Sequence, residues 1–280
     1  RMFYGATGLT SIDIPNLVTS IGVEAFQDAS GLTSITIPSS VTSIGASAFE
    51  SATSLTQVTF APDISFGGIP KRMFYGATDL SSITIPNLVT SIGEEAFQYA
   101  SGLISVTIPA RVQTIGAYAF NLATSLTTVS FEEVSNLETI GNAAFQSATS
   151  LTSITIPPLV TSIGNNTFLN ASNLTSINIP ASVTYIGVNA FKDAALLTAI
   201  NVDGGNNNFL SRYGVLFNNN YSSLIKYPEG KSDTSYNIPN SVTNIEANSF
   251  INTDISLVYA YPILFSNISN NNTWVGGQTY

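Results

Sequence analysis

The sequence predicts a repeat solenoid of the α/β class. In this fold the chain winds as a right-handed superhelix with a parallel β-sheet on its concave face and short strands plus α or 3₁₀ turns on the other side. The first observation behind this prediction is a phenylalanine that recurs every 23 or 25 residues from Phe26 to Phe191. The second is that each phenylalanine stands in the same pattern of apolar positions. The third is a longer period of 71 residues, because the heptapeptide at 1–7 returns unchanged at 72–78.

The first element of each repeat is predicted to be a strand. In the repeat at 32–52, Ile35 and Ile37 are apolar and have polar residues between and beside them. This two-residue period is typical of a strand with one buried face. Pro38 follows and ends the strand, because proline has no N–H for a ladder. A second short extended segment is expected at 41–44.

The last element of each repeat is predicted to be a helical turn. Gly45 supplies flexibility where a positive φ is needed. Ala48, Phe49 and Ala52 stand at helical spacing, so one turn of α or 3₁₀ helix would place Phe49 in the core. A single repeat is too small to bury a core alone, so the repeats are stable only when they stack on their neighbours.

The consensus L-x-x-I-x-I-P-x-x-V-x-x-I-G-x-x-A-F-x-x-A resembles the BspA-type (Treponema-like) leucine-rich repeat. Residues 9–202 follow it nearly throughout, and residues 236–250 follow it again. In one departure, the family often has cysteine where this chain has alanine at the end of the repeat, at Ala29, Ala52, Ala100, Ala123, Ala148, Ala171 and Ala194. Both residue types are small and suit a buried position. The resemblance implies a leucine-rich-repeat solenoid that belongs to a cell-surface protein.

We expect one continuous solenoid domain in three parts. Residues 1–202 form the regular repeats of 23–25 residues, 203–235 an irregular repeat that carries a β-hairpin, and 236–280 the last repeat and a C-terminal cap. The hairpin strands are expected at 212–217 and 221–227, on either side of an Asn-Asn-Asn turn. The hairpin is either a structural variant of one repeat or a protruding aromatic and basic contact patch.

The composition argues against catalysis. Histidine and cysteine are absent, which removes the commonest general bases, thiol nucleophiles and zinc ligands. The carboxylate pairs Glu94-Glu95 and Glu132-Glu133 fall at variable, exposed positions, whereas a glycosidase pair shares one cleft. The turn that begins at Asp203 lacks the oxygen ligands of a calcium loop. We therefore expect no enzyme, no cofactor and no metal site.

Charge and hydropathy argue against two further partners. A net charge of −9 with only 8 lysines and arginines leaves no basic stripe for nucleic acid. No apolar run is long enough to span a bilayer, so membrane insertion of this sequence is not expected. The sequence opens inside a repeat, and we expect it to be a piece of a longer protein. An uncapped strand edge at 9–14 would then allow edge-mediated self-association.

Departures from the consensus mark the candidate ligand contacts. The consensus strand positions carry small hydroxyls, which either only keep the sheet face soluble or support broad, modest contacts. Binding hot spots are usually aromatic or arginine side chains. The candidate ligand contacts are Tyr99, Ile104, Arg111, Gln113 and Tyr118 in the middle of the solenoid, Tyr185 in the eighth repeat, and Arg212, Tyr213, Tyr221 and Lys226 in the hairpin.

The resemblance implies a non-catalytic binding module, adhesin-like, that is extracellular or at the cell surface and binds a host or matrix protein or glycan. A second hypothesis is structural: the repeats act as a spacer that holds another domain of a longer surface protein. A remote alternative is ice binding by the threonine array, which would need a flat face matched to the ice lattice.

Overall fold

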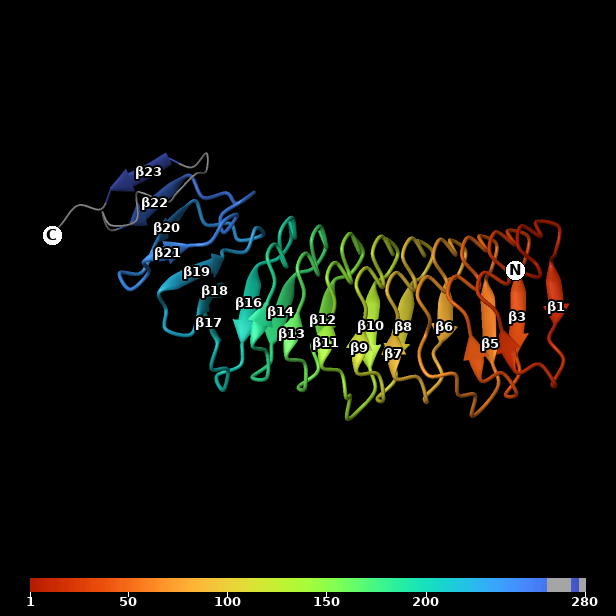
Figure 1. Ribbon diagram of the computed structural model, residues 1–280. Coiled ribbons are helices and arrows are strands. Elements are labelled where there is room, and N and C mark those ends of the chain that lie inside the picture. The colour runs from red at the N-terminus through yellow and green to blue at the C-terminus, as the bar shows by residue number, and fades with distance from the viewer. Residues whose placement is uncertain (261–272, 277–280) are drawn as a thin grey trace.

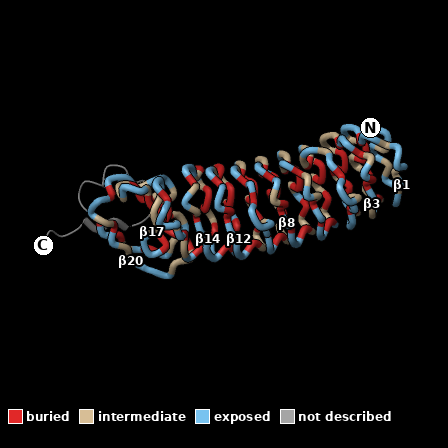
Figure 2. Tube along the Cα trace, turned by 90° about the horizontal axis from the view of Figure 1, so that it is seen from below, coloured by how far each residue is buried: buried red, intermediate tan, exposed pale blue. Residues whose placement is uncertain are grey.

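The structure is a computed structural model that describes residues 1–260 and 273–276. The chain winds into an elongated parallel β-solenoid, with β1 at one end and the hairpin region with the last strands at the other (Figure 1). Each regular turn of the solenoid has three faces, which we call the long-strand face, the short-strand face and the turn face. Buried residues form a continuous interior along the body (Figure 2). The solenoid fold predicted from the repeat period is confirmed.

The long-strand face contains two parallel sheets. Their strand orders are β1-β3-β5 and β16-β14-β12-β10-β8-β6. Residues 23 apart pair across the first sheet, as Ile35 does with Val58. The strands are β1 (Ser11–Asp13), β3 (Ser34–Ile37), β5 (Gln57–Phe60), β6 (Ser82–Thr84), β8 (Ser105–Ile108), β10 (Thr128–Phe131), β12 (Ser153–Thr155), β14 (Ser176–Ile179) and β16 (Ala199–Val202).

The short-strand face has a two-residue strand in most repeats. Its sheets have the orders β2-β4 and β15-β13-β11-β9-β7. The strands are β2 (Ser20–Ile21), β4 (Ser43–Ile44), β7 (Ser91–Ile92), β9 (Thr114–Ile115), β11 (Thr139–Ile140), β13 (Ser162–Ile163) and β15 (Tyr185–Ile186).

The turn face is not helical, which corrects the expected α or 3₁₀ turn. No helix occurs in the described part of the chain. The residues two positions before and after each phenylalanine have positive φ, for example 57° at Glu95 and 61° at Tyr99. The N–H of Phe97 then donates to the carbonyl of Ala119 in the next repeat at 2.8 Å, while the N–H of Ala96 bonds within its own turn. In a helix, every backbone N–H would bond within the same segment, whereas here every second backbone N–H of the turn face bonds to the neighbouring repeat.

The phenylalanines form one continuous column in the core. Nine rings stack with centres 5.2–5.9 Å apart, and those that are neighbours in the column are nearly parallel. The column runs through Phe3, Phe26, Phe49, Phe74, Phe97, Phe120, Phe145, Phe168 and Phe191. Offset stacking of this kind adds to the burial of each ring.

The glycine at the corner before the turn is required because a Cβ there would clash with the preceding repeat, not because its φ is positive. Gly45 does not have a positive φ, in contrast to our expectation. A Cβ at Gly45 would lie 2.3 Å from the backbone nitrogen of Val23, and one at Gly141 would lie 2.7 Å from that of Ala117. Successive repeats therefore approach each other backbone to backbone at this corner.

The strand faces are interrupted at one place, which we call the block junction. β5 and β6 are neighbours in the stack but belong to different sheets. On the short-strand face, Pro70 stands where other repeats have the corner glycine. That glycine normally donates its N–H to the preceding repeat, as Gly93 does to Ile69 at 2.8 Å, and proline has no N–H to do so. The turn face continues across the junction, where Phe49 N–H bonds to the carbonyl of Met73 at 3.0 Å.

The irregular repeat forms an antiparallel meander of three strands. β17 (Phe209–Arg212), β18 (Val215–Asn218) and β19 (Ser223–Lys226) pair in order, and β19 then pairs parallel to β21 (Asn244–Ile245). The strand expected at 221–227 corresponds to β19, but the one expected at 212–217 is broken, because Arg212 ends β17 and a turn at Tyr213 and Gly214 precedes β18.

The last repeat has a core of its own. Tyr227 is fully buried and stacks on Phe250 with ring centres 5.4 Å apart, so a tyrosine takes the role of the phenylalanine there. The remaining strands are β20 (Ser235–Asn237), β22 (Leu257–Ala260) and β23 (Thr273–Gly276), paired in that order. Most of the expected C-terminal cap, at 261–272 and 277–280, lies outside the described residues.

Candidate binding surface

The adjacent carboxylates are held in separate interactions. Glu94 pairs with Lys71 at 2.9 Å, and Glu95 pairs with Arg72 at 3.3 Å. Glu132 accepts the N–H of Ala110 at 3.0 Å. Within the described residues, no group of three or more acidic, histidine or cysteine side chains could hold a metal ion. The described part of the chain also has no helix of the length and hydropathy that crossing a membrane requires.

The threonine rows on the strand faces are bonded within the solenoid. On the long-strand side, threonine hydroxyls donate to the backbone carbonyl of the residue 23 positions earlier at 3.0–3.2 Å, at Thr33, Thr56, Thr127, Thr175 and Thr198. A second row does the same on the short-strand side at 3.2–3.3 Å, at Thr42, Thr90, Thr161 and Thr184. Because the hydroxyl hydrogens are used between repeats, these rows stabilise the stack and have no donor left for a ligand.

The mid-solenoid candidates do not form one patch. Ile104 directly precedes β8 on the long-strand side, and half of it is exposed. Arg111 and Gln113 lie in the loop before β9. Tyr99 and Tyr118 lie on the turn face, in neighbouring repeats. Of the five candidates, only these two tyrosines share that face.

Tyr185 lies apart from the other candidates. It belongs to β15 on the short-strand face, and its hydroxyl donates to Oδ1 of Asn165 at 3.1 Å. This tyrosine is therefore exposed but tied to the preceding repeat.

The turn face carries an aromatic cluster centred on Arg72, Tyr75 and Tyr99, which we call the tyrosine cluster. The rings of Tyr75 and Tyr99 meet edge to face with centres 5.2 Å apart, and the guanidinium carbon of Arg72 lies 4.1 Å from the centre of the Tyr75 ring. Arg72 also pairs with Glu50 at 2.8 Å. These contacts fix the rings, while Tyr99 stays 42% exposed and Tyr118 in the next repeat 39% exposed.

Burial, together with the neighbouring Tyr99, raises the pKa of Tyr75 above its ordinary value of 10.0, so its hydroxyl stays protonated to a higher pH than that of a free tyrosine. Arg72 and Tyr75 were not among the candidates chosen from the sequence. The sequence signal that could have identified them is the heptapeptide found at 1–7 and again at 72–78. In this heptapeptide, and in no other repeat, an arginine and a tyrosine flank the core phenylalanine.

A second cluster lies on the meander and consists of Arg212, Tyr213 and Tyr221, which we call the hairpin cluster. The guanidinium of Arg212 lies 5.6 Å from the ring centre of Tyr213 and 5.7 Å from that of Tyr221. It also donates from Nη1 to the hydroxyl of Tyr221 at 3.1 Å. The structure thus brings together three of the four hairpin candidates.

Lys226 does not belong to the hairpin cluster, which corrects the fourth hairpin candidate. Its side chain is buried, and Nζ pairs with Oε1 of Glu229 at 2.7 Å. Burial lowers the pKa of Lys226, and the attraction of Glu229 opposes that shift. The sequence showed an alternating strand but not which side of it would face the neighbouring repeat.

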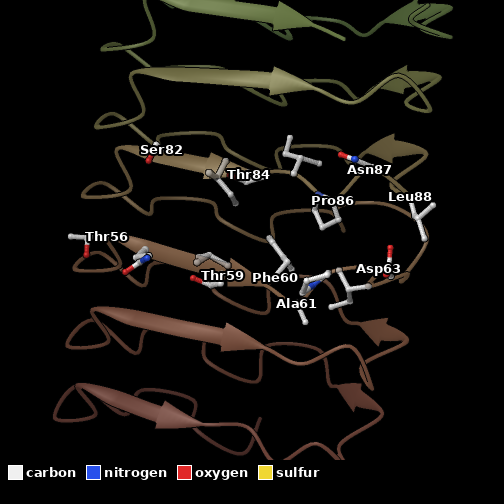
Figure 3. A pocket seen from close by; sticks show the side chains of 16 residues that line it. Thr56, Thr59, Phe60, Ala61, Asp63, Ser82, Thr84, Pro86, Asn87 and Leu88 are labelled. Carbon is white, nitrogen blue, oxygen red and sulfur yellow. The ribbon is translucent and has the colours of Figure 1, made fainter. Parts of the chain in front are cut away.

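The block junction opens a groove of about 500 Å³ between β5 and β6 (Figure 3). Thr59 and Thr84 lie along it on the two strands, and Phe60 and Pro86 lie where the strands end. Asp63 is the single charged residue of its lining. The groove therefore offers hydroxyls and an apolar floor, but few anchors for a strong ligand.

The first turn of the solenoid leaves its outer side uncovered. β1 is the end strand of its sheet and pairs only with β3. An apolar hollow of about 330 Å³ lies beside it, lined in part by Phe3, Ile14 and Val18. This is the strand edge for which self-association was considered, and that association stays a prediction.

The fold and its exposed side chains define a parallel β-solenoid of the leucine-rich-repeat class, which is a scaffold that presents side chains from stacked turns. The chain belongs to the BspA type leucine rich repeat family, whose model matches residues 1–120 and 90–222 in 6 copies. The chain matches none of the curated proteins with which it was compared.

Solved structures with this fold come from bacterial proteins. A leucine rich cell surface protein from Faecalibacterium prausnitzii is 30% identical with a TM-score of 0.66, and the match covers 89% of this chain and 63% of that one. The pneumococcal vaccine antigen PcpA is 25% identical with a TM-score of 0.50, over 89% of this chain and 54% of that one. A leucine-rich repeat protein from Eubacterium ventriosum, at 22% identity and a TM-score of 0.51, shares the fold. The chain thus spans less than two thirds of the length of these relatives.

Proposed function

We propose that this chain is a non-catalytic binding module of a cell-surface or secreted protein, adhesin-like, whose ligand is a host or matrix protein or glycan. One observation carries the proposal. Exposed aromatic rings lie in the tyrosine cluster, where Tyr99 packs on Tyr75 and Arg72, and in the hairpin cluster beside Arg212. The threonine rows that precede the strands instead use their hydroxyls between repeats. Rigid aromatic and arginine side chains are the residues that most often dominate binding energy.

The comparisons support the cellular setting. The relative from Faecalibacterium prausnitzii is described as a cell surface protein, and PcpA is described as a vaccine antigen. A module of this family at the outside of a cell would meet host proteins and glycans, which is consistent with the proposed ligand classes.

Binding of the purified chain to immobilised fibronectin, laminin, collagen and a glycan array tests the proposal. We expect saturable binding to at least one of them. The double variant Tyr99→Asn and Tyr118→Asn removes the exposed ring of the tyrosine cluster and the exposed ring of the next repeat on the turn face. It should weaken binding to a ligand of this face about tenfold or more, because each ring is a candidate anchor. Asparagine keeps the backbone conformation, since Asn166 and Asn170 have the same positive φ at the same offsets.

Asp28→Asn is the matched control, because it places the same residue at the offset of Tyr99 in a repeat without tyrosine. It should bind like the parent chain. Absence of binding to every member of the panel would contradict the proposal.

A structural spacer is the second candidate function, and one observation favours it. The phenylalanine column and the hydrogen bonds between repeats run along the axis, so the chain forms a stiff rod. The panel separates the two functions, because a spacer binds none of its members. Part of the threonine array is not free for the ice-binding alternative, since the hydroxyls of rows such as Thr33 and Thr175 donate to the backbone.

A further inference from the structure

Most positive charges of this chain are neutralised by a nearby carboxylate. Of the 8 lysines and arginines, 6 have a carboxylate oxygen within 4.0 Å. Within the part of the chain that the structure describes, the two without such a partner are Arg111 and Arg212. In a chain with a net charge of −9, an arginine without a carboxylate partner is an exception.

Arg212 differs from Arg111 because aromatic rings hold it. Its guanidinium lies beside the rings of Tyr213 and Tyr221, and it donates hydrogen bonds to the tyrosine hydroxyls, at 3.1 Å to that of Tyr221. A guanidinium has five N–H donors. The two tyrosine hydroxyls use only some of these donors, and no carboxylate of the described residues pairs with the others, so they are available to an anion from solvent.

The backbone holds Tyr213 in an exposed position. Tyr213 and Gly214 form the tight turn between β17 and β18, with φ values of 53° and 80°. Such a turn favours Gly, Asn or Asp at both positions, so a tyrosine there is a conformationally costly choice of the kind found at functional sites. The ring is nevertheless 82% exposed.

The turn is also fixed against the solenoid. The N–H of Ile200 in β16 donates to the carbonyl of Gly214 at 2.9 Å, and a Cβ at Gly214 would lie 3.0 Å from Ala199. Lys231 holds the same turn, because its Nζ donates to the carbonyl of Tyr213 at 3.4 Å while it pairs with Asp233 at 3.4 Å. Tyr213 is thus a preorganised aromatic surface next to a cation.

We infer that Arg212, Tyr213 and Tyr221 form a binding site for a carboxylated sugar, such as a sialic or uronic acid residue at the end of a glycan. The inference rests on the proposed binding function and names the ligand class for the hairpin cluster. An arginine offers paired donors to a carboxylate, and the exposed Tyr213 ring offers a flat apolar face. A carboxylated sugar carries an apolar ring face and a carboxylate within one residue, whereas a peptide would have to supply them from two side chains.

Titration calorimetry with four soluble probes tests this inference. The probes are 3′-sialyllactose, trigalacturonate, lactose and a short acidic peptide. We expect at least one acidic sugar to bind at least tenfold more tightly than lactose and the peptide. A preference between the two acidic sugars identifies the source of the carboxylate.

Two variants and one control locate the site. Arg212→Gln removes the charge, and Tyr213→Asn removes the ring with a residue that suits the turn; each should weaken binding of the acidic sugar at least tenfold. Arg111→Gln removes the other unpaired arginine and should leave binding unchanged. Circular dichroism of all three variants should match the parent chain, because both arginines and Tyr213 are exposed.

Three results would overturn the inference: no binding of either acidic sugar, equal binding of the peptide, or unchanged binding by both hairpin variants. If these occur while the chain still binds a matrix protein or another glycan, the proposed function stands and only this site is wrong. If the chain binds nothing in either experiment, both proposals fail.

Discussion

The rings of Phe97 and Phe120 are parallel within 1°, and their centres lie 5.2 Å apart. Both side chains are fully buried. The same relation is repeated from Phe3 to Phe191, so each ring is packed by the repeat before it and by the repeat after it. The stability of any one repeat therefore depends on its neighbours in the stack.

Phe120→Ala should destabilise the chain by about 3–5 kcal/mol, because it removes a fully buried ring and leaves a cavity between two others. Chemical denaturation measures this change in the free energy of unfolding. Phe3→Ala is the matched control, since Phe3 lies at the end of the column, is only partly buried and has one ring neighbour. Equal losses in the two variants would mean that the rings do not act as a column.

Val134→Asn should stabilise the chain by about 1 kcal/mol, because valine is β-branched and is held at a φ of 58°, a conformation that asparagine tolerates far better. The side chain is 89% exposed, so little packing is lost. Val188→Asn serves as the comparison, since Val188 is also exposed but does not have a positive φ. The midpoint temperature of thermal unfolding should rise only for Val134→Asn. A rise in both variants or in neither would contradict this explanation.

The phenylalanine column and the strands could be predicted because the buried apolar positions recur in every repeat of the sequence. The alternation of Ile35 and Ile37 and the position of Pro38 give a strand that ends at Ile37 in the structure. The turn face was predicted as helical because the spacing of Ala48, Phe49 and Ala52 fits a helix as well as it fits the observed turns. What decides between them is the hydrogen bonding between repeats, which no local pattern in one repeat contains.

Hydrogen–deuterium exchange should be faster at the block junction than elsewhere in the long-strand face. β5 and β6 each have an unpaired side where they face one another, whereas β8 is paired on both sides. Amides that lack a partner exchange without opening of the sheet, so peptides from β5 and β6 should contain a fast-exchanging fraction that β8 lacks. Uniform protection of the three strands would show that the sheets are continuous in solution.

Tyr236→Phe should reduce the loss of stability at alkaline pH. Burial raises the pKa of Tyr236 above its ordinary value of 10.0, so the folded chain keeps the proton while the unfolded chain loses it. The unfolded state therefore binds fewer protons above pH 10, and stability falls as pH rises from there. Near pH 11–12, the free energy of unfolding should fall by about 1.4 kcal/mol less per pH unit in the variant than in the parent chain. Denaturation curves at several pH values check this, and parallel pH profiles would contradict it.

The candidate contacts were only partly predictable. Arg212, Tyr213 and Tyr221 were chosen because aromatic and basic residues gather around a hairpin, and a hairpin brings its two strands together by local pairing. The mid-solenoid set failed as one patch because Ile104 and Tyr118 share a repeat but lie on different faces. Tyr75 was missed because its contact with Tyr99 joins side chains at different offsets in successive repeats, one residue after Phe74 and two residues after Phe97.

In the proposed binding function, ligands contact the chain through exposed aromatic side chains of the tyrosine cluster, the neighbouring Tyr118 and the hairpin cluster. Hydroxyl-radical footprinting measures the accessibility of each tyrosine side chain with and without a saturating concentration of the tightest ligand from the matrix and glycan panel. We predict lower oxidation of Tyr99 and Tyr118, or of Tyr213, and unchanged oxidation of Tyr4 and Tyr259, which are exposed but lie outside both clusters. Unchanged oxidation of Tyr99, Tyr118 and Tyr213 while the ligand is bound would show that these rings do not contact the ligand.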